Sequence, residues 1–231
     1  MNISGAVIVV FFLVIIGAFI FIVVQSSRKD VEAKRQTARA MGFTPISADT
    51  VLSDKISALY QNKNILNKYA LRNVSQKRTP DRDMYLFDLI NTSGEDDSST
   101  ENQAVAIVSP HLNLPPFTLF PKSDEKYKLS GLTNKILEWG TSLLLGDPVP
   151  FPEFPAFSSR YIITSNQPDL VRSFIDENIA RYFSKTQMYS LHASGNVFTF
   201  SEMEPRFNAS DPNSMNQRVN RAAEIFRVFQ K

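Results

Sequence analysis

The sequence predicts an α+β fold, in which an N-terminal transmembrane helix precedes one domain with helices packed on an antiparallel or mixed sheet. Three observations lead to this prediction. Residues 6–24 are apolar without interruption, four strand-like runs follow one another between residues 69 and 120, and helical and strand patterns alternate after residue 130. Adjacent strands with short links favour antiparallel pairing, because a parallel pair needs a long crossover connection.

The first expected element is a membrane anchor. Residues 1–27 carry no charged side chain, and about 20 apolar residues at ~1.5 Å rise span a ~30 Å hydrocarbon core. A cleaved signal peptide would need a basic n-region before a core of about 7–15 residues, and neither is present. We therefore expect an uncleaved single-pass segment that contacts the lipid bilayer through residues 6–24.

Flanking charge predicts the orientation of this anchor. The basic residues after it are Arg28, Lys29, Lys34, Arg35 and Arg39, and no Lys or Arg precedes it. The positive-inside rule then predicts an inner-membrane protein with its N-terminus outside and its C-terminal domain in the cytoplasm. The absence of cysteine is consistent with a reducing compartment.

The remaining chain divides into two parts. Residues 28–47 favour a juxtamembrane helix, ended near Gly42, and a linker. Residues 48–231 are expected to form a single domain, with a possible subdivision near residues 146–158. Its first half should contain a helix with Leu52, Ile56, Leu59 and Tyr60 on one face, strands at 69–75, 83–90, 104–108 and 117–120, and a polar loop at 91–102.

The second half of the domain should contain six further regular segments. The first five are a helix at 130–145, a strand at 160–165, a helix at 168–183 and the two hairpin strands 188–191 and 197–200. Asp211 and Pro212 begin a last helix that ends near Gln230. Prolines between residues 147 and 157 predict an extended strap, and Phe151, Phe154 and Phe157 should bury it against the domain.

Composition and motifs exclude several classes of protein. The formal net charge is only +2, which argues against a nucleic-acid binder, and no cysteine is available for disulfides, thiolate metal sites or nucleophilic catalysis. The sequence contains neither glycine-rich phosphate-binding motif and neither a GxSxG nor an HxxxH motif. We therefore expect no cofactor and no metal.

Three residues remain as weak candidates for catalysis. Asp88 is the one charge in an otherwise apolar strand, so we expect a structural ion pair or hydrogen bond there, with Arg72 as a candidate partner. His111 follows Ser109 and Pro110 in a turn, and His192 ends a hairpin strand. Histidines in such places are more often solvated or locally hydrogen-bonded than catalytic.

Three blocks carry a resemblance to a family. They are residues 84–89 (MYLFDL), residues 108–121 with the pattern LPxFxLxP, and residues 154–163 with the pattern FSxxY, and Val171-Arg172 follows in a helix. Together they resemble a loose group of uncharacterised bacterial single-pass membrane-anchored proteins. The resemblance covers roughly residues 38–200 and implies a bacterial origin and an anchor followed by one domain. It implies no activity, cofactor or catalytic residue.

The sequence leaves two functional hypotheses open. The first is a membrane-tethered, non-catalytic interaction or accessory domain that acts on another membrane protein. The alternative is a hydrolase-like enzyme that uses Asp88, His111 or His192. A pocket that holds two of these side chains within hydrogen-bond reach would favour the enzyme.

Overall fold

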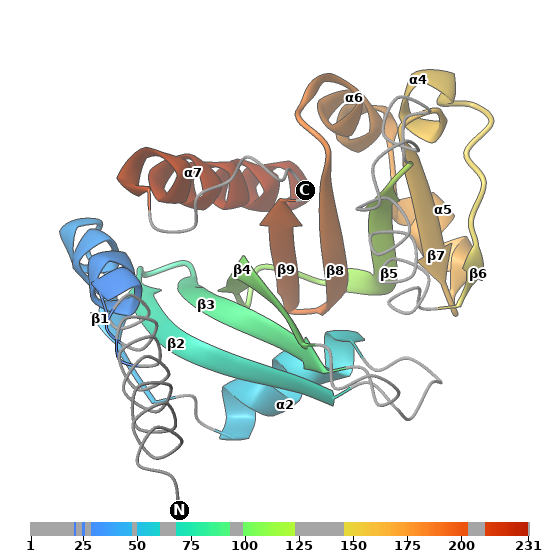
Figure 1. Cartoon of the computed structure of the whole chain (residues 1–231). Coiled ribbons are helices and arrows are strands. Elements are labelled where there is room, and N and C mark those ends of the chain that lie inside the picture. Colours follow the sequence, from blue (N-terminus) through green and yellow to red (C-terminus); the bar gives the residue numbers. More distant parts are fainter. Residues whose placement is uncertain are drawn as a thin grey trace, which may run out of the picture.

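A computed structural model describes most of the domain. The described residues are 21, 25, 29–47, 50–60, 68–92, 99–122, 146–202 and 211–230. Within them the chain forms a nine-stranded sheet in the order β1-β2-β3-β4-β9-β8-β5-β7-β6 (Figure 1), and all of its strand pairs are antiparallel.

The strands follow the alternating pattern of the sequence closely. Their bounds are β1 Thr44–Pro45, β2 Lys68–Arg78, β3 Asp83–Thr92, β4 Ser99–Val108, β5 Leu114–Pro121, β6 Asp147–Pro148, β7 Tyr161–Ser165, β8 Tyr189–Gly195 and β9 Val197–Glu202. The helices are α2 Thr50–Tyr60, α4 Pro155–Ser158, α5 Pro168–Phe174, α6 Glu177–Lys185 and α7 Pro212–Phe229. A further helix covers residues 29–40, and we call it the N-terminal helix.

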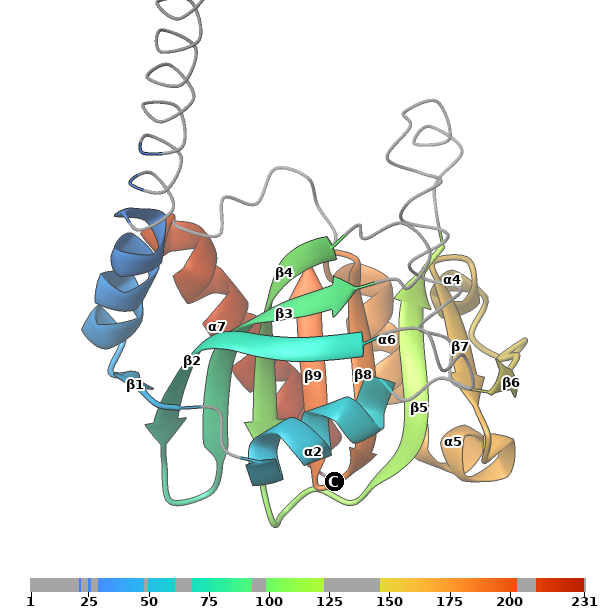
Figure 2. The same cartoon turned by 60° about the horizontal axis from the view of Figure 1, so that its bottom comes forward.

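Helices cover both faces of the sheet. Figure 2 shows α2 in front of the central strands and α7 behind them. Leu52, Ile56 and Leu59 of α2 form one apolar cluster with Phe87 and Leu89 of β3. The larger cluster lies on the other face and unites the apolar side chains of α4–α7 with those of β3–β5 and β7–β9. The sheet therefore separates two cores, and α2 contributes to the smaller one.

The predicted fold class needs a correction. The α+β class and the antiparallel sheet are as expected, but the prediction began with a transmembrane helix. Within the part of the chain that the structure describes, none of the helices combines the length and the apolar character needed to cross a membrane. The fold of the described residues is therefore α+β without a membrane-spanning helix. Residues 6–24, apart from Phe21, lie outside the described residues.

The N-terminal helix belongs to the domain. It ends before Gly42, whose φ of +83° is a helix-ending conformation that favours glycine, as the sequence predicts. Ala38 and Phe43 are buried in the larger core. The segment predicted as a juxtamembrane linker thus contributes side chains to the same core as α7.

Two predicted boundaries were wrong. The polar loop expected at 91–102 is shorter, because β3 continues to Thr92 and β4 begins at Ser99. The single helix expected at 168–183 is two helices, because Ile175 is extended and the Asp176 side chain accepts a hydrogen bond from the Ile179 amide to begin α6. The helix expected at 130–145 lies outside the described residues.

The proline strap is ordered against the domain, as predicted. Phe151 and Phe157 are buried, and Phe154 is half-buried and stacks on Phe151. The Val149 amide donates to the Ile163 carbonyl, which continues the short pairing of β6 with β7. One detail differs, because Pro155 begins the short helix α4. Proline at a first helical position loses no hydrogen bond.

Candidate functional site

Asp88 lies in a buried polar cluster on the face of the sheet that also carries α7. Its side chain is 2% exposed, and Oδ2 lies 3.5 Å from Lys34 Nζ of the N-terminal helix. The amide Nδ2 of Asn73 donates to the same oxygen at 2.7 Å. The expectation of an ion pair or hydrogen bond is confirmed. Arg72 lies opposite Asp88 in the β2–β3 ladder but is exposed to solvent.

The backbone beside this cluster is irregular. The pairing of β2 with β3 shifts register between Arg72 and Ser75, and Asn73 within this bulge has a φ of +51°. Asparagine tolerates this left-handed conformation better than most residues. The bulge turns the Asn73 amide toward Asp88, so that the carboxylate has a donor from its own side of the sheet.

A second buried charge lies next to Asp88. Gln103 is paired with Asp88 across the β3–β4 ladder, and its Oε1 accepts a hydrogen bond from Nη1 of Arg218 on α7. Arg218 is 3% exposed. One signal in the sequence could have revealed it, because Arg218 lies three residues after Met215 on the apolar face of α7.

The space inside this cluster is small. Side chains of Lys34, Asn73, Asp88 and Gln103 help to enclose a cavity of about 10 Å³. That volume is about enough for one water molecule. Neither His111 nor His192 lines it. The cluster can bind a water molecule, but it has no room for an organic substrate.

His192 lies on the opposite face, beneath α2. It is 1% exposed, its Nδ1 lies 3.2 Å from Thr118 Oγ1, and its ring centroid lies 4.3 Å from that of Tyr60. Its Nε2 has no partner of good hydrogen-bond geometry among the described residues, although the backbone of Leu59 is close enough to influence the ring.

Burial determines the charge of this histidine. Desolvation lowers the pKa of His192 to about 3, and the nearby backbone of Leu59 opposes this shift only in part. His192 is therefore neutral near pH 7, and its protonation in the folded protein requires a pH several units lower. A general base or acid works best with a pKa near the working pH, so this environment is poor for proton transfer.

Hydroxyl side chains surround His192 on the same face. Tyr60 Oη and Thr199 Oγ1 are 2.8 Å apart, and Ser190 Oγ and Ser201 Oγ are 2.9 Å apart. All of these residues are buried. Sequence reasoning missed this group, although alternating Ser, Thr and His in β8 and β9 marks one polar face for each strand. The hydroxyls bond to one another, which satisfies them without water.

His111 lies in the exposed turn between β4 and β5, near Ser109 and Asp81. These three residue types also occur in hydrolase triads, but their bonding here is different. Ser109 Oγ donates to the Asp81 backbone carbonyl at 2.6 Å and accepts from the His111 backbone amide at 3.1 Å. A hydrogen bond from Thr79, with the nearby Arg82 guanidinium, lowers the pKa of the Asp81 carboxyl. These bonds shape a turn and do not activate the Ser109 hydroxyl.

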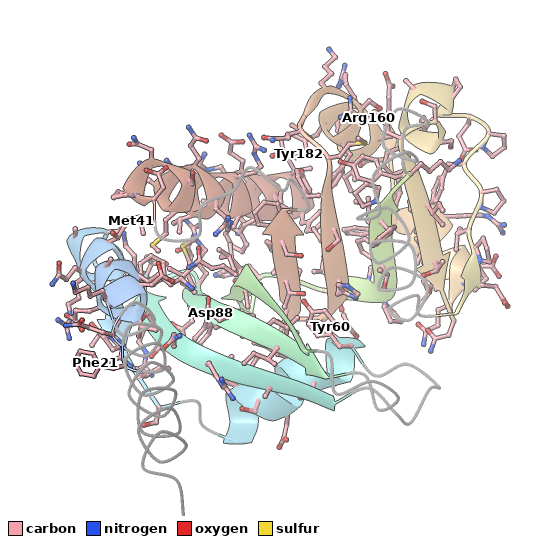
Figure 3. All side chains as sticks on the ribbon, viewed as in Figure 1. Phe21, Met41, Tyr60, Asp88, Arg160 and Tyr182 are labelled. Atoms are coloured by element: carbon pink, nitrogen blue, oxygen red, sulfur yellow. The ribbon has the colours of Figure 1, made fainter. Side chains whose placement is uncertain are left out.

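The three candidate residues are far apart. Through the β3–β4–β9 ladder, the Asp88 side chain lies on the same face of the sheet as Phe200. His192 is paired with Thr199, the residue before Phe200 on β9, and therefore lies on the other face. Successive side chains of a strand point to opposite faces. Three strand spacings, roughly 14 Å, also separate β3 from β8. Figure 3 shows Asp88 well separated from Tyr60, whose ring contacts that of His192.

Two larger grooves lie elsewhere on the surface. One, of about 420 Å³, follows the strap and is lined mainly by Val149, Phe151, Tyr161 and Ile163. The other, of about 630 Å³, lies between the N-terminal helix and the first half of α7, near Asn213 and Asn216. Asp88, His111 and His192 line neither groove. Among the described residues, no group of His, Asp and Glu could hold a metal ion.

Comparison with known proteins adds no assignment. No protein family model, curated protein or solved structure matches the chain. The resemblance to bacterial membrane-anchored proteins therefore stays a prediction from the sequence.

Proposed function

We propose that the protein is a membrane-attached interaction or accessory domain without catalytic activity, which acts on another membrane protein. The observation that carries this proposal is the separation of the candidate side chains. Asp88 and His192 are buried on opposite faces, and His111 is exposed on a turn. In that turn the Ser109 hydroxyl donates to the Asp81 backbone carbonyl, and the Asp81 carboxylate accepts from the Thr79 hydroxyl. A hydrolytic site would need two such groups around one accessible space.

Residues 6–24 attach the protein to the bilayer in this proposal, and the domain faces the cytoplasm. The support comes from the sequence, which is uncharged to residue 27 and basic directly after it. The structure assigns different environments to the basic residues. Lys34 is bound to Asp88, whereas the side chains of Arg35 and Arg39 are exposed and could contact anionic headgroups.

Affinity purification from detergent-solubilised membranes tests the proposed function. Tagged wild-type protein and the variant His111→Ala/His192→Gln should retain the same membrane-protein partner at the same stoichiometry, because neither histidine takes part in binding. A tagged unrelated single-pass protein serves as the control for carry-over. The enzyme alternative would replace the proposal if purified wild-type protein hydrolysed ester or phosphoester substrates and the double variant did not.

The orientation has a separate test, since the natural chain contains no cysteine. A single cysteine at Ser98 should react with a membrane-impermeant thiol reagent only after the cells are permeabilised. A single cysteine at Ser4 is the matched control and should react in intact cells. Labelling of the Ser98 variant in intact cells would place the domain outside and overturn the proposed orientation.

A further inference from the structure

We propose that the N-terminal helix is a latch with two positions, docked on the sheet through Lys34 and Asp88 or released from it. This inference concerns the helix and the sheet alone, so it does not depend on the proposed function. In the docked position the helix lies beside the β2 end of the sheet and the first half of α7 (Figure 2). Three features of the interface indicate that release is accessible.

The first feature is a small apolar contact. Within residues 29–40 only Lys34 and Ala38 are buried, and Ala38 is the smaller of the two. By contrast, α7 buries Met215, Ile225, Phe226 and Phe229 against the sheet. Free energy from hydrophobic burial scales with the area removed from water. The N-terminal helix therefore has far less holding it than α7, and local opening should begin there.

The second feature is that each half of the ion pair has another partner on its own side. Lys34 Nζ lies 3.6 Å from Asp30 Oδ2 within the helix, and 3.5 Å from Asp88 across the interface. Asp88 also accepts a hydrogen bond from Asn73 on β2. When a buried pair is broken, the large cost comes from leaving one charge unpaired. Release leaves Lys34 with Asp30 and Asp88 with Asn73, so that cost is reduced.

The third feature is an entry point for water. The cavity beside Lys34 and Asp88 admits about one water molecule, which can solvate the two charges as they separate.

Release would uncover a defined surface. The side of the interface opposite the helix carries Asp88, Asn73 and the apolar Leu86 from the sheet, together with Met215 from α7. The latch thus controls the exposure of a mixed acidic and apolar surface on the domain.

Hydrogen exchange of the full-length protein in detergent micelles tests the latch. Amides of residues 33–40 should exchange about tenfold faster than those of residues 219–229, after correction for intrinsic rates. Asp88→Asn should accelerate amide exchange in the N-terminal helix by about a further tenfold and leave the exchange rates of α7 unchanged. Lys34→Gln gives the same test from the helix side if Asp88→Asn does not fold. Asp169→Asn, which removes an exposed ion pair with Arg172, is the control and should change neither segment.

The double variant Lys34→Met/Asp88→Leu distinguishes a latch from an ordinary structural contact. Opening would then expose two apolar side chains, so exchange of the helix should fall below the wild-type rate. The proposal is wrong if the helix and α7 exchange at the same rate in the wild-type protein. It is equally wrong if the double variant releases the helix as fast as Asp88→Asn does.

Discussion

Buried polar residues are the least expected feature at the scale of single residues. Asp88, His192 and Arg218 are each at most 3% exposed, although ionisable side chains are rarely buried without a partner. Two of them carry a charge and are hydrogen-bonded to neighbours on other elements. The third avoids the cost of burying a charge by staying neutral. Each solution depends on residues distant in the sequence, so each links separate elements.

His192 should make the protein sensitive to acid. Its pKa is about 3 in the folded protein and near 6.5 when unfolded, so the unfolded state binds more protons between these values. The folded state is then favoured fully above pH 6.5 and loses stability as the pH falls toward 3. The loss should approach about 1.4 kcal/mol per pH unit. Urea unfolding of the wild-type protein and of His192→Gln at pH 7 and pH 5 measures this difference.

The glutamine variant should lose less stability between these two pH values than the wild type, because its side chain does not titrate. His111→Gln is the matched control for the loss of a histidine, since His111 is exposed. Equal pH dependence of the wild type and His192→Gln would show that His192 is accessible to protons in the folded state.

At the scale of elements, aromatic packing connects the short helices to the sheet. The Phe183 ring of α6 lies between 5.4 and 6.3 Å from those of Phe157, Tyr161, Tyr182, Tyr189 and Phe229. Phe174, at the end of α5, is half-buried and lies 5.4 Å from Phe229. The break at Ile175 thus gives the two phenylalanines different environments, although the sequence predicted a single helical face.

Phe183→Ala should lower the free energy of unfolding by about 3–5 kcal/mol, the range for a fully buried aromatic side chain. Phe174→Ala should cost less, about 2 kcal/mol, because part of its ring already contacts water. Denaturant midpoints at constant m-value measure both. Equal losses for the two variants would contradict the observed difference in burial.

Two glycines provide a matched test of backbone conformation. Gly146 has a φ of +81°, and a Cβ there would lie 2.3–2.5 Å from backbone atoms of Ser165 and Asn166. Gly195 turns the β8–β9 hairpin with a φ of +59° and has open space around it. Gly195→Ala should cost about 1–2 kcal/mol for the left-handed conformation alone. Gly146→Ala should cost about 2–5 kcal/mol because a steric clash is added.

Thermal unfolding monitored by circular dichroism compares the two glycine variants. The expected order is a larger fall of the midpoint for Gly146→Ala than for Gly195→Ala. The opposite order would mean that the close approach of Gly146 to the end of β7 is wrong, and with it the pairing of β6 with β7.

At the scale of the whole molecule, one sheet unites residues from position 44 to position 202. The N-terminal helix and α7 lie on one of its faces, although the strands of the sheet come between these two helices in the sequence. The strap lies at the β6–β7 edge of the same sheet. Truncation should therefore have an effect that depends sharply on where the chain is cut.

Removing residues 1–27 should leave a folded domain with an unchanged unfolding midpoint, because the buried residues described here lie after this segment. Removing residues 1–43 also deletes Ala38 and Phe43, which are 2% exposed in the larger core. Loss of a buried phenylalanine costs about 3–5 kcal/mol, so the midpoint should fall by about 10 °C. Equal midpoints for the two truncations would show that the N-terminal helix is not part of the fold.

The sequence alone determined most of the secondary structure and the pattern of burial. Alternation in β3 and the apolar faces of α2 and α7 were readable because side-chain direction repeats with the local geometry of strand and helix. The ordered strap was predictable from its three phenylalanines, since exposing them would cost too much. Gly42 and Asp211 mark helix ends for equally local reasons.

Only the tertiary structure decided the partners of the buried charges and the strand order. Lys34 meets Asp88 because β2 bulges at Asn73 and the N-terminal helix packs above it, and no local pattern encodes that meeting. His192 and Asp88 are separated because the sheet order places β4 and β9 between their strands and the pleat turns them to opposite faces. Periodicity shows which side chains face inward. Which of them touch depends on long-range pairing, and the interactions that set this pairing act between residues far apart in the chain.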